Sequence, residues 1–217
     1  MATVPFLEKN MEVLFEDKNL IVAIKERGLL SEEHESKPNM VTLLKEITKG
    51  EIFPVHRLDK DVGGVMVYAK TKKAAADLSK QVGDRTMDKI YYARLHGIPE
   101  EKEGDLEDLL YFDKGKNKSF VVKKERKGVK KALLSYKVLS ENNDSALVEV
   151  KLHTGRTHQI RVQFASRKMP LYGDRRYGAK DDSKIIALWS EEISFIHPVT
   201  KEKMTFSRLP EESIFTL

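Results

Sequence analysis

HRLDKDVGGVMVYA, residues 56–69, joins a charged cluster to two glycines and an apolar run. The run Val65–Ala69 predicts a buried strand. Gly63 and Gly64 allow the backbone to turn tightly and to come close to another group, which the sequence does not identify. Asp59 therefore lies between a basic pair and a tight turn, which suits chemistry on a polyanion. The alternative is an ordinary surface turn that Asp59 caps.

The flanking residues predict short strands and two helices. Val13–Phe15 and Leu20–Ile24 are apolar runs separated by four polar residues and predict a hairpin. Val41–Ile47 predicts a short helix. Thr71–Val82 predicts an amphipathic helix with Thr71 as its N-cap. Lys89–His96 predicts a strand, because it is rich in Tyr and Ile.

The second half of the chain is predicted to be mainly strand. Thr157–Arg167 is the exception, a predicted helix with Thr157 near its N-cap and Arg161 facing inward. The predicted strands are Leu106–Tyr111, Ser119–Lys123, Ala132–Leu139, Ala146–Leu152, Lys184–Trp189, Ile193–Ile196 and Lys203–Phe206. This pattern favours an α+β (mixed α/β) fold with a long, mostly antiparallel central sheet and flanking helices. The length of 217 residues predicts a single domain, residues 1–217.

The positive charge is segregated along the chain. The net charge is +5, but residues 114–131 hold nine Lys or Arg and one acid, Glu125. Residues 153–180 hold seven Lys or Arg and one acid, Asp174. One positive face on an otherwise acidic body is expected of a nucleic-acid partner. A solvated, lysine-rich loop is the alternative for residues 114–131.

The composition excludes several classes of site. The chain has no cysteine, which excludes disulfides, thiolate metal sites and cysteine nucleophiles. Its six histidines include no helical pair four residues apart, so no metal site is predicted. The first twenty residues are charged and contain no long apolar run, so neither a signal peptide nor a membrane span is expected. We expect a cytoplasmic protein with no membrane association and no obligate protein partner.

Several blocks, in order along the chain, resemble one enzyme family. HRLDKDVGG, residues 56–64, resembles the HRLD-x-x-[ST]-G motif of the RluA-type RNA pseudouridine synthases. KIYYARLHG, residues 89–97, resembles K-x-Y-x-A-x-V-x-G. HTGRTHQIRVQ, residues 153–163, contains a counterpart of T-G-R-[TS]-H-Q-I-R-V-H, and PLYGDRRYG, residues 170–178, resembles the block that follows it. The resemblance runs from about Glu12 to Phe206.

The resemblance implies a fold, an activity and three catalytic residues. The fold has an active-site cleft between two lobes. The reaction isomerises a uridine of structured RNA, either tRNA or rRNA, and needs no cofactor. Asp59 matches the family's catalytic Asp, and Arg161 matches the arginine expected to hold that carboxylate ionised through a two-pronged contact. Tyr91 matches the tyrosine that stacks on the uracil.

The same comparison suggests residues that contact the RNA. Leu188 occupies the position of an apolar pocket floor, and Arg57 suits the place where a base leaves the stack. His56, Arg156, His158 and Gln159 are candidates for binding phosphate or neighbouring bases, with a structural role as the alternative for each. The resemblance is to a stand-alone catalytic domain, without an RNA-binding module of the S4 kind.

Two questions stay open at this point. Asp59 can assist either by adding covalently to the substrate or by taking a proton from the sugar. A non-catalytic RNA-binding protein derived from this fold is the second functional class. It stays open because Val62-Gly63 and Gln163 depart from the family pattern.

Overall fold

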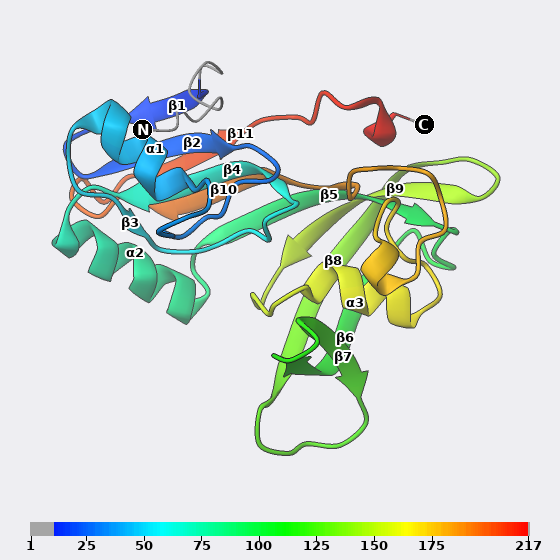
Figure 1. Cartoon of the computed structure of the whole chain (residues 1–217). Coiled ribbons are helices and arrows are strands. Elements are labelled where there is room, and N and C mark those ends of the chain that lie inside the picture. The colour runs from blue at the N-terminus through cyan, green and yellow to red at the C-terminus, as the bar shows by residue number, and fades with distance from the viewer. Residues whose placement is uncertain (1–10, 217) are drawn as a thin grey trace.

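The computed structural model describes residues 11–216 and contains one sheet of eleven strands with three α-helices (Figure 1). The helices are α1 (Met40–Thr48), α2 (Lys72–Asp84) and α3 (Gln159–Ser166), and two 3₁₀ turns are η1 (Arg175–Tyr177) and η2 (Ser213–Phe215). The strands are β1 (Val13–Glu16), β2 (Leu20–Lys25), β3 (Phe53–Pro54), β4 (Gly63–Ala69), β5 (Asp88–His96), β6 (Glu103–Asp113), β7 (Lys118–Val122), β8 (Val129–Glu141), β9 (Ser145–Leu152), β10 (Leu188–Ile196) and β11 (Lys203–Ser207).

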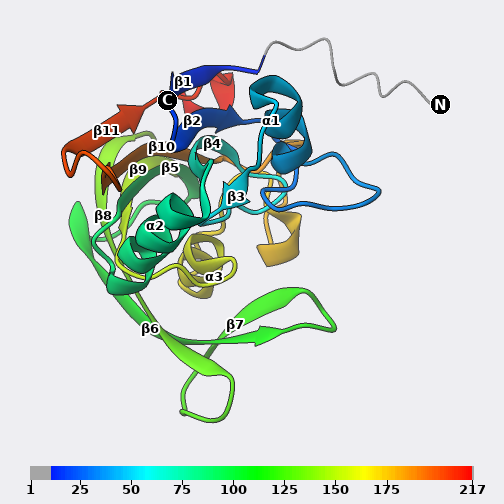
Figure 2. The same cartoon turned by 90° about the vertical axis from the view of Figure 1, so that its left-hand side faces the viewer.

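The sheet is mostly antiparallel, as the strand pattern predicted. Its strand order is β1-β2-β4-β10-β5-β9-β8-β6-β7, with β11 paired to β10 and β3 to β4. Among these strand pairs, β4–β10 alone is parallel. The sheet therefore brings β4, which follows the Asp59 loop, next to β10 and one strand away from β5. It ends in the hairpin β6–β7, which extends away from the body (Figures 1 and 2).

Two apolar clusters cover the two faces of the sheet. Alternate residues of β2 divide between them, because successive side chains of a strand point to opposite faces. Ile21 packs in the cluster that includes residues of α1 and α3, and Val22 in the cluster that includes residues of α2 and η2. Tyr91 and Tyr92 divide in the same way. Strand geometry thus places Tyr91 on one face of β5 and Tyr92 on the other.

Most predicted elements occur close to their predicted bounds. The Val13–Phe15 and Leu20–Ile24 hairpin is confirmed as β1–β2. Thr71 is the N-cap of α2, and its side-chain oxygen accepts a hydrogen bond from the Ala74 N–H at 3.2 Å. That cap satisfies one of the donors that a helix start leaves free.

Thr157 lies next to the N-cap of α3, as predicted, and the cap itself is His158, in the left-handed region at φ 55°. One prediction of strands was wrong. The predicted strands Lys184–Trp189 and Ile193–Ile196 are one strand, β10, which begins at Leu188. The polar residues at the centre of β10 suggested a boundary between two separate strands. They lie instead at a bulge, because the register with β5 shifts between Ser190 and Glu192.

No helix within residues 11–216 is long and apolar enough to cross a membrane. The prediction that the chain starts without a signal peptide falls partly on residues 1–10, which lie outside the described residues.

Candidate active site

A cavity of about 460 Å³ lies between the Asp59 loop, the end of α2, β5 and the start of α3. Asp59, Tyr91 and Arg161 all line it, and so do the other predicted site residues His56, Arg57, Arg156, His158, Gln159 and Leu188. Its volume is within the range usual for small-molecule sites. The fold therefore brings together residues that lie far apart in the sequence; His56 and Leu188, for example, are separated by 132 positions.

The Asp59 loop is held from two directions. Lys25, which is fully buried, donates hydrogen bonds from Nζ to the carbonyl oxygens of Lys60 at 3.1 Å and Val62 at 2.7 Å. Ser31 holds the other side, because its hydroxyl donates to the Leu58 carbonyl and accepts from the Leu58 N–H, both at 3.0 Å. These contacts restrict the backbone on both sides of Asp59.

The two glycines let β4 approach β10 closely. Gly64 has φ +128°, and a Cβ atom there would lie 2.2 Å from the Ser190 carbonyl oxygen. A Cβ atom on Gly63 would lie 2.5 Å from the Trp189 ring. Each glycine is paired in the parallel ladder with the residue that its Cβ would strike. The close approach is what places the Asp59 loop beside β10.

Arg161 contacts two carboxylates. Its Nη1 donates to Asp59 Oδ2 at 2.9 Å, while Nε and Nη2 donate to the two oxygens of Asp174 at 2.6 and 2.9 Å. The predicted two-pronged contact to Asp59 is therefore wrong, because the fork of the guanidinium faces Asp174. Burial disfavours the charged guanidinium, but the hydrogen bonds and charge of Asp174, with those of Asp59, raise the pKa of Arg161. Arg161 stays a cation beside Asp59.

Tyr91 lies in the wall of the cavity and is 5% exposed. Burial raises the pKa of its hydroxyl, so the ring stays neutral. Leu188, also 5% exposed, lines the same cavity from β10. A neutral aromatic ring and an apolar side chain can hold the flat face of a base.

His158 lies beside the carboxylate of Asp59. Its Nε2 is 3.7 Å from Asp59 Oδ2, and its Nδ1 is hydrogen-bonded to the Tyr177 hydroxyl at 3.0 Å. Burial lowers the pKa of His158, and the neighbouring Arg161 adds to this, although the negative charge of Asp59 opposes both. The ring is therefore neutral near pH 7 and competes little with Arg161 for Asp59.

The side chains of His56 and Gln159 form hydrogen bonds with other groups of the protein. His56 Nε2 accepts the Val67 N–H at 3.2 Å, and burial, with the nearby Lys89 charge, lowers the pKa of His56 to about 3. Gln159 Oε1 accepts from the Thr154 hydroxyl at 2.8 Å and the Arg156 N–H at 3.0 Å. Its Nε2 donates to a backbone carbonyl as well. Gln159 thus supports the loop that precedes α3.

Arg57 and Arg156 present charge at the cavity. Arg57 is exposed, and its Nη2 donates to the Thr157 hydroxyl at 3.3 Å. Arg156 donates from Nε to the Lys131 carbonyl at 2.9 Å, which ties it to the edge of β8. Both guanidinium groups keep further donors, because each arginine carries five.

The sequence prediction missed three residues of this site. Asp174 and Tyr177 occur in the block at residues 170–178, but nothing in that block indicated their contacts to Arg161 and His158. Tyr177 also lies under the Arg161 guanidinium, 5.2 Å from the ring centre. Lys89 lines the cavity, and burial lowers the pKa of its amine. Its position at the start of the 89–97 block was the only available signal.

These features define a class of protein. A carboxylate held by a buried arginine, beside a neutral tyrosine in a cavity of a long antiparallel sheet, agrees with the resemblance found in the motifs. The model of the RNA pseudouridylate synthase family matches residues 19–166, and the chain belongs to that family.

Individual relatives agree with the family. An uncharacterised RNA pseudouridine synthase of Mycoplasma genitalium is 33% identical over 202 residues, which cover 90% of this chain and 65% of that protein. Ribosomal large subunit pseudouridine synthase D of Borreliella burgdorferi is 36% identical over 183 residues, covering 79% of this chain and 56% of that protein. The chain thus spans less than two thirds of the length of either relative.

The solved structure of human RNA pseudouridylate synthase domain containing 4 has the same fold. It superposes with a TM-score of 0.76 at 25% identity, covering 92% of this chain and 89% of that one. The mixed α/β fold with its large antiparallel sheet is therefore that of the pseudouridylate synthases.

Proposed function

We propose that this chain is an RNA pseudouridine synthase that converts a uridine of structured RNA into pseudouridine, with Asp59 as the catalytic carboxylate. The observation that carries the proposal is the 2.9 Å contact between Arg161 and Asp59 inside a cavity that Tyr91 also lines. The reaction breaks the N1–C1′ bond, rotates the uracil and joins C5 to C1′. The proton lost from C5 is balanced by the proton gained at N1, so no redox cofactor is required.

Each named residue has a role in this proposal. The Arg161 guanidinium holds the Asp59 carboxylate through a hydrogen bond of 2.9 Å, and this carboxylate either adds covalently or takes a proton from the sugar. Tyr91 and Leu188 hold the uracil after it leaves the RNA stack, because a base inside a helix is inaccessible. Arg57, exposed at the cavity, contacts the strand from which the base leaves. Lys89 and Arg156 add positive charge near the phosphates.

Ribosomal RNA is the first substrate to test, and tRNA the second. The support is the name of the Borreliella relative, which is a ribosomal large subunit enzyme. Short motifs do not encode which loop of an RNA is recognised, since that depends on shape. The experiment must therefore include both RNA classes.

The experiment compares wild type with Asp59→Asn and with Asp61→Asn as a matched control. Asp61 is exposed in the same loop, and its side chain has no hydrogen bond among the described residues. Each protein is incubated with bulk rRNA and tRNA, and new pseudouridines are mapped chemically. We expect Asp59→Asn to lower product formation at least about 1000-fold while RNA binding persists, and Asp61→Asn to match wild type. Wild-type turnover in Asp59→Asn would refute the role of Asp59.

The second candidate is a non-catalytic RNA-binding protein, suggested by the departures at Val62-Gly63 and Gln163. Gln163 donates from Nε2 to the Leu106 carbonyl at 2.9 Å and to Asp108 at 2.8 Å, outside the cavity lining. Val62 is buried in the core, and its carbonyl accepts from Lys25. Neither departure removes Asp59, Tyr91 or Arg161, which favours the enzyme. Wild-type protein that binds RNA and leaves every uridine unmodified would favour the second candidate.

A further inference from the structure

Arg27 lies in the turn that follows β2, two residues after the buried Lys25, and its side chain is 15% exposed. It is not among the residues that line the cavity. Its guanidinium nevertheless contacts three parts of the chain that are far apart in sequence. These are the Asp59 loop, the residues before β10, and residues 208–216, here called the C-terminal segment. The roles proposed above use no atom of Arg27.

One nitrogen of Arg27 joins two walls of the cavity. Its Nη1 donates to the Asp61 carbonyl at 2.9 Å and to the Ile186 carbonyl at 2.8 Å. Asp61 lies two residues after Asp59. The Ile186 carbonyl also accepts the Leu188 N–H at 2.7 Å. Arg27 therefore links the loop that carries the proposed catalytic carboxylate to the start of β10, which lines the cavity.

Arg27 is responsible for one carbonyl of the Asp59 loop, and other groups hold its neighbours. The carbonyls of Lys60 and Val62, on either side of Asp61, accept from Lys25 Nζ. Loss of Arg27 therefore leaves both of those contacts in place. We expect the loop to become looser without it, and not to detach.

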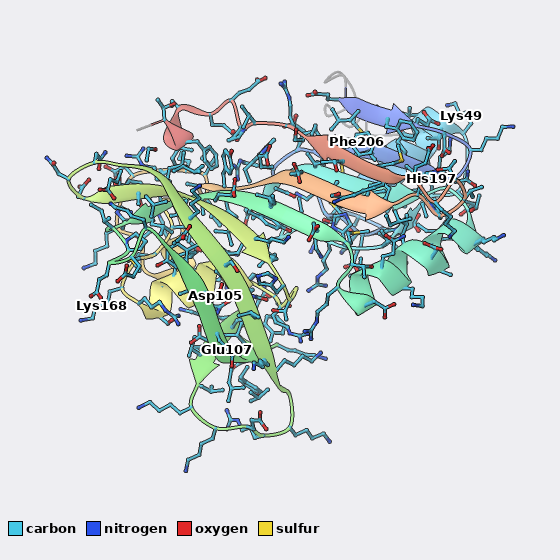
Figure 3. All side chains as sticks on the ribbon, turned by 180° about the vertical axis from the view of Figure 1, so that it is seen from behind. Lys49, Asp105, Glu107, Lys168, His197 and Phe206 are labelled. Atoms are coloured by element: carbon cyan, nitrogen blue, oxygen red, sulfur yellow. The ribbon has the colours of Figure 1, made fainter. Side chains whose placement is uncertain are left out.

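The C-terminal segment fixes the direction of the Arg27 side chain. The segment leaves β11 close to Phe206, which Figure 3 labels, and runs to η2 (Figures 1 and 3). Arg27 Nε donates to Glu212 Oε1 at 2.8 Å, and the guanidinium carbon lies 6.0 Å from the centre of the buried Phe215 ring. A charge-assisted hydrogen bond and a cation–π contact together restrict the guanidinium. The segment thus orients Nη1 towards its two carbonyls.

Fold stability alone does not account for this arginine. Its Nη2 is buried and has no hydrogen-bond partner within residues 11–216. A buried donor without a partner lowers stability, and an apolar side chain would avoid that cost. An apolar side chain would not join the Asp61 and Ile186 carbonyls, however. The bridge between the two walls is what requires an arginine.

We propose that Arg27 is a positioning residue for the reaction, which holds the Asp59 loop at a fixed distance from β10 in an orientation set by Glu212. This inference rests on the proposed function. Arg27 acts through the loop and touches neither the substrate nor the cavity. A displacement of about 1 Å at a reacting group can slow a reaction about 100-fold, so a looser loop is expected to affect the rate more than the affinity.

The test compares Arg27→Ala with Arg94→Ala as a matched control. Arg94 Nη1 donates to the carbonyls of Ile214 and Thr216 in the C-terminal segment, at 3.2 and 3.3 Å. Both variants therefore remove an arginine that binds this segment. Within residues 11–216, the Arg94 side chain forms no hydrogen bond with the Asp59 loop. Thermal melting first establishes that each variant is folded.

The readouts separate rate from affinity. We expect Arg27→Ala to lower the single-turnover rate at saturating RNA at least about tenfold, with the Kd for rRNA and tRNA within about threefold of wild type. Arg94→Ala is expected to stay within about twofold in both. Hydrogen exchange of the peptide covering residues 56–64 is expected to be at least about tenfold faster in Arg27→Ala than in Arg94→Ala.

A milder pair of variants decides the inference if Arg27→Ala does not fold. Glu212→Gln removes the charge that orients Arg27, and Glu211→Gln removes the neighbouring charge, which pairs with Arg208 at 2.5 Å. We expect the single-turnover rate to fall about threefold in Glu212→Gln and to be unchanged in Glu211→Gln. Equal rates in this pair would contradict the role of Glu212 in orienting the bridge.

Two further results would overturn the inference. Equal single-turnover rates in Arg27→Ala and Arg94→Ala would show that Arg27 only anchors the C-terminal segment. A raised Kd with an unchanged single-turnover rate would show that Arg27 acts on RNA binding. Neither result bears on the proposed function, which fails if the wild type makes no pseudouridine. In that case hydrogen exchange at residues 56–64 still decides whether Arg27 holds the loop.

Discussion

Arg161 divides its guanidinium between two carboxylates, and Asp174 receives the larger part. Asp174 is fully buried and accepts two hydrogen bonds from Arg161, whereas Asp59 accepts one and keeps a quarter of its side chain exposed. A buried cation with no partner is strongly unfavourable, so Asp174 is what allows Arg161 to be charged inside the protein. Asp59 Oδ1 accepts no hydrogen bond within residues 11–216, so in the proposed function it is left for the substrate. Asp174 is a positioning residue in this arrangement.

Asp174→Asn tests that arrangement. We expect the single-turnover rate at saturating RNA to fall at least about tenfold, because Arg161 loses the charge that orients it, while RNA affinity is kept. Asp108→Asn is the control, since Asp108 pairs with Arg167 at 2.8 Å outside the cavity. That variant is expected to lose stability and to keep its rate. Equal rates in the two variants would contradict the role of Asp174.

His56 links stability to pH. Its folded pKa is about 3, below the value of about 6.5 expected in the unfolded chain. Between these values the unfolded state binds a proton that the folded state does not, so this contribution is complete above pH 6.5 and is lost as pH falls towards 3. Urea denaturation of wild type and His56→Gln at pH 7.5, 6.0 and 4.5 measures it.

The glutamine in that variant can accept the Val67 N–H without taking up a proton. We therefore expect a smaller fall in the free energy of unfolding between pH 7.5 and 4.5 in His56→Gln than in wild type. An identical fall in both proteins would show that His56 carries none of the pH dependence.

The pairing of β4 with β10 is the contact between elements on which the site depends most. It is the parallel pair in an otherwise antiparallel set of strand pairs, and it joins the strand after Asp59 to the strand that carries Leu188. Glycine at positions 63 and 64 makes it possible, because any side chain there would meet β10. The strand pair therefore holds two walls of the cavity together.

Gly64→Ala should break this pairing. The new methyl group would lie 2.2 Å from the Ser190 carbonyl, and φ +128° is itself strained for alanine. We expect a loss of more than about 3 kcal/mol in the free energy of unfolding, measured by urea denaturation. Gly83→Ala, in α2, has open space around the new methyl and should gain about 1 kcal/mol. A stability unchanged by Gly64→Ala would contradict the close approach.

At the scale of the whole molecule, the sheet consists of two halves that carry different elements. One half of the sheet carries β4 and β10, the Asp59 loop and the two helices α1 and α2 (Figure 1). The other half carries β8 and β6 and ends in β7. The cavity lies between the two halves, lined by the Asp59 loop on one side and by residues 152–161, from the end of β9 to the start of α3, on the other. The proposed chemistry thus lies at the boundary between the two halves of one continuous sheet.

Much of this organisation could be predicted from local patterns. The hairpin β1–β2, the capped helix α2 and the opposite faces of Tyr91 and Tyr92 follow from residue periodicity and from one capping side chain. These features depend on neighbours within a few positions, so the chain encodes them directly. The motifs around Asp59, Tyr91 and Arg161 likewise indicated which residues meet in the cavity.

The partners of those residues required the folded chain. Arg161 lies 102 positions from Asp59, and no local pattern shows that its fork faces Asp174 or that Gln159 turns back to its own loop. The continuity of β10 was equally hidden, because a bulge accommodates polar residues that suggested a break. Hydrogen-bond partners are chosen by three-dimensional proximity, and burial then determines their strength. Local sequence therefore specified the elements and the candidate residues, whereas long-range packing assigned each side chain its partner.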